Sequence, residues 1–170
     1  LAPEGPYLTV DSQMTDVMYG SQTSLSIDLE NVGSDAAETL LITLTSDDEY
    51  VTMIDDNETI SLDAGSATTV SGFSANISSM IPDGHQITFN VSLVSGDYNW
   101  DYSFVTNAMA PKISFVGMSG DLQPGSTSSV VITMMNEGGA EMMYPQISLE
   151  MGNYLTASNI SFSGSDFVWP

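Results

Sequence analysis

The sequence predicts an all-β protein with an immunoglobulin-like β-sandwich, arranged as a tandem repeat whose second copy is incomplete. Short apolar runs alternate with polar residues, as at Leu25, Ile27 and Leu29, and this period of two is typical of half-buried strands. Clusters of Ser, Thr, Asp, Asn and Gly separate the runs, as expected of turns between strands. The chain also matches itself at an offset of 105 residues, close to the roughly 100 residues of one immunoglobulin-like domain.

The internal repeat combines identities at turns with agreement at alternating core positions. Asn31 falls on Asn136 and Gly33 falls on Gly138, both in a turn. The apolar matches include Leu8 with Ile113, Ile27 with Ile132, Leu29 with Met134 and Ile42 with Ile147. Because turns and core positions agree together, the repeat indicates two copies of one fold.

The first copy has room for a whole sandwich. Its strands are expected at 7–11, 22–30, 39–46, 49–54, 58–62, 66–77, 85–94 and 98–107. The segments Asn31–Ser34 and Pro82–Gly84 have the residues of turns. Seven or eight strands at this spacing favour two packed sheets, so residues 1–109 form the first predicted domain.

The second copy, residues 110–170, has room for only the first half of a sandwich. Strands are expected at 112–117, 128–135, 144–151, 153–156 and 159–163, with a turn at Pro124-Gly125. Several apolar residues would lack a facing sheet, namely Ile132, Met134, Ile147, Leu149 and Met151. We therefore expect that this half-copy was cut from a longer chain or is completed by strands of another molecule.

The charge balance excludes some partners. The chain has 22 acidic residues and one basic residue, Lys112, for a net charge of -21. Nucleic acid and anionic membrane surfaces are disfavoured as partners, because binding them requires Lys and Arg. Three explanations remain open: compositional drift, a salt-adapted surface, and avoidance of proteases that cleave after Lys or Arg. The chain has no cysteine and hence no disulfide.

Catalytic and metal sites have few candidates. His85 is the only histidine, and we expect it to be an exposed residue at the start of a strand. With no second base and no cysteine, no catalytic triad can be assembled, so the chain is not expected to be an enzyme. Four turn carboxylates could supply oxygen ligands to Ca²⁺: Asp47, Asp48, Asp55 and Asp56. The alternative is that these acids are solvated and stabilise their turns. No other cofactor is expected.

Residues 98–107 contain an aromatic-rich strand with Tyr98, Trp100 and Tyr102. Core packing accounts for two of these side chains. An exposed aromatic face for carbohydrate is the alternative.

Several turn and core motifs carry a family resemblance. They are Pro6-Tyr7-Leu8, Tyr19-Gly20-Ser21, Leu29-Glu30-Asn31-Val32-Gly33-Ser34, Tyr50-Val51-Thr52 and Pro82-Asp83-Gly84-His85. Together they resemble the CARDB-like immunoglobulin-fold modules that follow the catalytic domain in gingipain-like cysteine peptidases and occur in other bacterial surface proteins. The sequence has no catalytic cysteine or histidine pair, so no peptidase residue carries over. The resemblance implies an extracellular spacer, stabiliser or adhesive stalk, and the scarcity of Lys and Arg would then protect it from self-digestion.

The leading functional hypothesis is a non-catalytic structural or adhesion module at the cell surface or in the extracellular space. Its partners would be neighbouring domains of a parent protein or another copy of itself. Two alternatives remain: a carbohydrate-binding accessory domain, with or without Ca²⁺, and a subunit of a surface filament or layer assembled by strand complementation.

Overall fold

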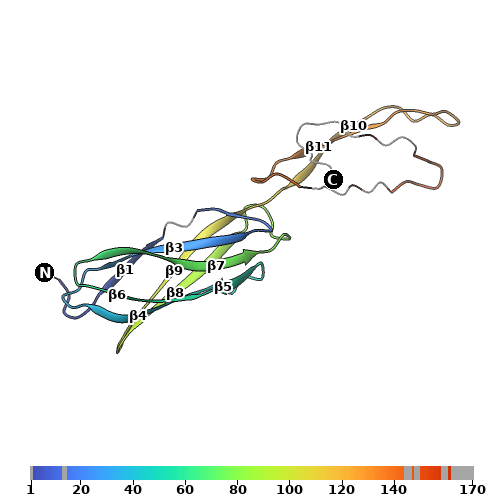
Figure 1. The fold of residues 1–170 in the computed structure, drawn as a ribbon. Coiled ribbons are helices and arrows are strands. Elements are labelled where there is room, and N and C mark those ends of the chain that lie inside the picture. The colour runs from blue at the N-terminus through green and yellow to red at the C-terminus, as the bar shows by residue number, and fades with distance from the viewer. Residues whose placement is uncertain (1, 13–14, 144–146, 148–149, 158–160, 162–170) are drawn as a thin grey trace. The chain divides into compact units, whose positions relative to one another are not determined.

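The computed structural model describes residues 2–12, 15–143, 147, 150–157 and 161. Contacts divide the chain into two units, Leu1–Met109 and Ala110–Pro170, and each is described by itself. The described residues form eleven strands in three sheets (Figure 1). None of the described segments is a helix of the length and apolarity needed to cross a membrane.

The first unit is a sandwich of two sheets (Figure 1). The four-stranded sheet has the order β1-β3-β7-β5, with bounds Leu8–Ser12, Gln22–Asn31, Ala67–Ile77 and Val51–Asp55. The five-stranded sheet has the order β2-β9-β8-β4-β6, with bounds Val17–Met18, Tyr98–Met109, Gln86–Ser95, Ala37–Thr45 and Asn57–Leu62. All pairs are antiparallel except β2 with β9.

The core lies between these two sheets and follows the predicted alternation. The fully buried large side chains include Leu8, Ile27, Leu29, Leu40, Ile42, Leu44, Phe73, Ile87, Phe89 and Leu93. On β3, β4 and β8 these residues are separated by two or four positions, which places them on one face of the sheet. The prediction of an all-β sandwich is confirmed, and the expected strands of the first copy lie within a few residues of the observed bounds.

The sequence analysis missed one short strand, β2. Its two residues pair in parallel with β9, as Val17 with Ala108 and Met18 with Met109. The Thr106 hydroxyl reinforces the pairing by donating to the Thr15 carbonyl at 2.9 Å. Two residues are too few to show any periodicity, so nothing in the pattern could reveal this strand.

The second unit contains a two-stranded antiparallel sheet, β10 (Ile113–Ser119) with β11 (Val131–Asn136). The predicted turn at Pro124-Gly125 is present: Gly125 has φ 74, and the Ser126 amide donates to the Gln123 carbonyl at 3.3 Å.

Three other strands expected in the second unit have different outcomes. Residues 153–156 are not a strand, because the Leu155 amide donates to the Gly152 carbonyl at 3.0 Å and closes a tight turn. The expected strands 144–151 and 159–163 lie largely outside the described residues. The few positions described there, 147, 150, 151 and 161, are not in strands.

The internal repeat extends to the pairing register. In the first unit Leu8 pairs with Asn31 and Val10 with Leu29. At the same offset of 105 residues, Ile113 pairs with Asn136 and Phe115 with Met134. The two units therefore begin with the same hairpin-like pair of strands.

Candidate binding surfaces

A buried asparagine fixes the start of the first unit. Asn31 is fully buried, and its Oδ1 accepts hydrogen bonds from the Tyr7 and Gly33 amides, each at 3.1 Å. Its Nδ2 donates to the Asp35 carbonyl at 2.9 Å and to the Leu62 carbonyl at 3.1 Å. One side chain therefore satisfies four backbone groups from three segments, as a buried amide must. We call this arrangement the asparagine clamp.

The clamp recurs in the second unit. Asn136 Oδ1 accepts from the Lys112 amide at 2.9 Å and the Gly138 amide at 3.1 Å, and Nδ2 donates to the Ala140 carbonyl at 2.7 Å. A side chain at either Gly33 or Gly138 would overlap the backbone of the segment that enters the unit. Sequence reasoning found these residues only as a turn, although their identity across the repeat was the signal for a structural role.

His85 lies in a polar cluster, contrary to the expectation of an exposed strand-start residue. Its side chain is 31% exposed, and Nε2 lies 2.8 Å from Oδ2 of Asp48. The Tyr50 ring meets the imidazole edge-on, with centroids 5.1 Å apart. The cluster ties the turn before β5 to the turn before β8, so sequence reasoning, which treats turns separately, could not find it.

The surroundings of Asp48 shift its acidity. Burial raises the pKa of its carboxyl, but the hydrogen bonds from the Tyr50 amide and from His85, together with the charge of His85, lower it more. The net effect is a pKa below the ordinary value of 3.8. Asp48 is therefore held ionised by its neighbours.

The other three calcium candidates have separate partners. Asp47 is exposed. Oδ2 of Asp55 accepts from the Ser74 hydroxyl at 2.8 Å, and Oδ1 of Asp56 accepts from Nδ2 of Asn57 at 2.6 Å. In the described part of the chain, no group of three or more His, Asp or Glu side chains is arranged to hold a metal ion. Calcium binding at these four residues stays a prediction.

The aromatic row of β9 mostly covers the core. Trp100 and Tyr102 are half-buried, and the Tyr102 hydroxyl donates to the Leu8 carbonyl of β1 at 2.6 Å. Burial, and to a lesser extent Tyr7, raise the pKa of Tyr102. Tyr98 is 49% exposed and stacks on Trp100, with centroids 6.0 Å apart. The Tyr102 hydroxyl therefore links β9 of one sheet to β1 of the other.

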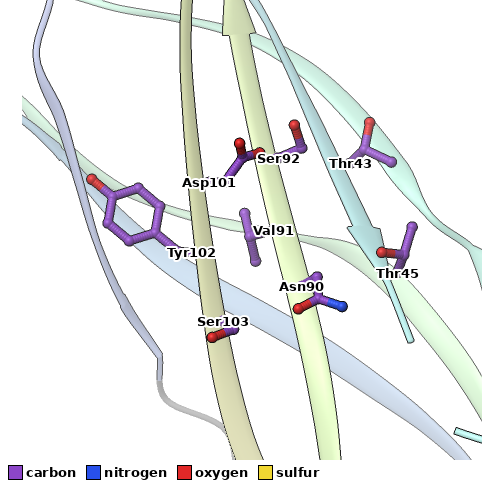
Figure 2. Close-up of a pocket in the computed structure, with 8 residues that line it drawn as sticks. All are labelled: Thr43, Thr45, Asn90, Val91, Ser92, Asp101, Tyr102 and Ser103. Carbon is purple, nitrogen blue, oxygen red and sulfur yellow. The ribbon is translucent and has the colours of Figure 1, made fainter. Parts of the chain in front are cut away.

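The outer face of the five-stranded sheet has a shallow depression lined mainly by hydroxyl groups (Figure 2). The depression lies over β4, β8 and β9. The polar side chains lining it come from Thr43, Thr45, Asn90, Ser92, Asp101 and Ser103. The register places Ser92 between Thr43 and Asp101, and Asn90 between Thr45 and Ser103. Asp101 is the one charged group among these residues. We call this surface the neutral face.

The outer face of the four-stranded sheet is acidic by contrast. Asp11 of β1 pairs directly with Asp28 of β3, and Glu30 lies two residues along the same strand. The Thr69 hydroxyl of β7 donates to Oδ1 of Asp28. The two outer faces of the first unit therefore differ in charge, although both belong to a very acidic chain.

Similar solved structures share the fold at low sequence identity. The segment of Escherichia coli alpha-2-macroglobulin from domain MG7 to the C-terminus matches with a TM-score of 0.52 and 15% identity, over 71% of this chain and 19% of that one. A mutant of Salmonella alpha-2-macroglobulin matches with a TM-score of 0.50 and 15% identity, over 70% of this chain and 8% of that one. This chain therefore spans about a fifth of the first structure and under a tenth of the second.

A CARDB domain is also among the similar structures. The domain from a Pyrococcus furiosus protein, solved in complex with di-metal ions, has a TM-score of 0.46 and 17% identity over 64% of this chain and 92% of that one. No protein-family profile and no curated protein sequence matches the chain. The β-sandwich fold of this chain is thus shared with segments of bacterial alpha-2-macroglobulins.

Proposed function

We propose that the chain is a non-catalytic section of a larger extracellular or cell-surface protein, in which repeated immunoglobulin-like modules act as a spacer, stabiliser or adhesive stalk. The asparagine clamp supports this proposal most directly. The same asparagine side-chain hydrogen bonds, the same tight glycine and the same first pairs of the register start both units. The clamp fixes the first strands of each unit. Its repetition along one chain suits a protein that is built from a series of modules.

The polar clusters fit structural roles. His85 and Asp48 bind each other across two turns, and the Asp55 carboxylate is paired with Ser74. The depression on the neutral face is shallow and offers one carboxylate, Asp101. We therefore assign these groups to the structure of the module and not to catalysis.

Antibody labelling of intact cells of the source organism tests the location and the role together. We expect an antibody raised against this chain to stain intact cells or to detect the protein in the medium. Deletion of residues 1–109 from the parent gene should shorten the surface structure or weaken adhesion. Staining that appears only after lysis would contradict the proposal.

A second candidate function, carbohydrate binding, is favoured by the neutral face. Its hydroxyls and amides, with Asp101 as an acceptor, match the donors and acceptors of a neutral glycan. A cationic partner would instead prefer the acidic face around Asp11, Asp28 and Glu30.

A neutral-glycan array, read with and without Ca²⁺, tests this candidate. Ser92→Glu places a bulky charge in the depression and should abolish any binding. Ser26→Glu is the matched control, because Ser26 is an equally half-buried serine on the outer face of the other sheet. Equal loss with both variants, or no glycan bound by the natural chain, would remove carbohydrate binding from consideration.

A further inference from the structure

Strand β11 presents one paired edge and one open edge. β10 pairs with it on one side, and among the described residues no strand pairs with its other side. Its counterpart β3 has both edges occupied, by β1 on one side and β7 on the other. Because the first pairs of β10–β11, up to Phe115 with Met134, repeat the register of β1–β3, the first unit shows which strand belongs at the open edge. That strand is the counterpart of β7, antiparallel to β11.

Side chains at the core positions of the second unit are exposed. Ile132 is 42% exposed, whereas its counterpart Ile27 is 0% exposed. Ile113 is 36% exposed against 0% for Leu8, and Val130 is 37% exposed against 5% for Leu25. Removing apolar side chains of this size from water favours association. Covering the inner face of β10–β11 with another strand is therefore favourable, because it would bury these exposed apolar side chains.

The open edge of β11 carries no charged residue and no Pro, and the bulge of this sheet, between Phe115 and Gly117, lies in the paired strand β10. Natural edge strands carry charges, Pro or bulges that prevent association with another strand. Residues 113–136 contain a single charged residue, Asp121, and β11 itself contains none. By contrast, 17 of the 22 acidic residues lie in residues 1–109. The edge is thus chemically suited to accept a strand.

We propose that the open edge of β11 and the inner face of β10–β11 form a docking site for a strand of the parent protein that has the apolar alternation of β7. In β7 that alternation places Val70 opposite Ile27 and Phe73 opposite Leu25. The corresponding contacts on β11 are Ile132 and the neighbouring Val130. At the offset of 105 residues, the counterpart of β7 would follow residue 170. The occupant is therefore this strand of the same repeat, and not a second copy of the chain.

A chain extended after Pro170 by a copy of residues 66–109, which contain β7, β8 and β9, tests the proposal. Covalent attachment gives the added strands an effective concentration on the order of millimolar. We expect amide hydrogen exchange at residues 131–135 to slow by at least about a hundredfold relative to the unextended chain. A second cooperative melting transition should appear.

Two variants of the extended chain separate docking from unspecific burial. Ile132→Glu puts a charge on the inner face and should remove the added protection. Met135→Glu is the matched control, because Met135 lies on the same strand with a similar exposure of 50% but on the outer face. The control should keep the protection.

A peptide with the sequence of residues 67–77, added to the natural chain, provides a second measurement if the extended chain does not fold. Protection of residues 131–135 on adding the peptide supports the proposal. The proposal is overturned if neither the extension nor the peptide slows exchange there. It is equally overturned if the natural chain alone gains that protection as its own concentration rises, since a second copy would then be the occupant.

Discussion

At the level of single residues, the asparagine clamp shows how one buried amide can organise a domain entrance. Asn31 bonds backbone groups of three segments, namely Tyr7, the turn at Gly33 and Asp35, and Leu62. Leaving a buried polar group without its hydrogen-bond partner costs about 1–3 kcal/mol of folding free energy. Asn31 therefore stabilises the fold mainly through the backbone groups to which it bonds.

Asn31→Ala removes all four hydrogen bonds of the clamp. We expect a loss of about 2–4 kcal/mol in the free energy of unfolding of the first unit, measured by urea denaturation. Asn136→Ala is the matched variant, and it should leave the unfolding of the first unit unchanged because it removes hydrogen bonds to Lys112, Gly138 and Ala140 of the second unit. Equal effects of the two variants on the first unit would contradict this account.

Asp48 makes the folding stability of the first unit depend on pH. Its pKa is lowered in the folded state, so its contribution to stability is present above the ordinary value of 3.8 and is lost as pH falls through the lowered folded value. We expect the natural chain to be more stable than Asp48→Asn at pH 5.5. The difference should shrink below about pH 4. Thermal melting of both proteins across this range checks it, and a difference that grows in acid would refute the assignment.

At the level of elements, regular alternation made most strands of the first unit predictable, because a strand that is half-buried must alternate. β3, β4 and β8 were read from residues such as Ile27, Ile42 and Phe89, all of which are fully buried. β2 could not be found, because its pairing depends on the distant strand β9 and its two residues carry no pattern.

Tyr102 joins elements that alternation alone cannot connect. Its hydroxyl donates to the Leu8 carbonyl at 2.6 Å and so links β9 of one sheet to β1 of the other. Tyr102→Phe keeps the ring and removes this bond, and should lower the free energy of unfolding by about 1 kcal/mol. Tyr98→Phe is the control, because Tyr98 is 49% exposed on the same strand, and chemical denaturation of both variants gives the comparison. A larger effect at Tyr98 would argue against the link.

At the level of the whole molecule, the sequence predicted the repeat but not the distribution of charge over its surfaces. The offset of 105 residues can be found by aligning the sequence with itself, and the structure repeats it in the first pairs of β1–β3 and β10–β11. The acidic and neutral faces of the first unit depend on which strands become neighbours, as when Asp11 meets Asp28. The Asp48–His85 pair depends likewise on two turns that only folding brings together.

Both units start with the same strand pair, and the first unit is closed around a core whereas the second has core positions exposed. Native-state hydrogen exchange on the full chain tests this central claim most directly, because it reports the stability of each strand separately. We predict that amides of Leu25, Ile27 and Leu29 exchange only when the first unit unfolds. Amides at residues 131–135 should exchange at least about a hundredfold faster. Equal protection of β3 and β11 in the isolated chain would contradict the account.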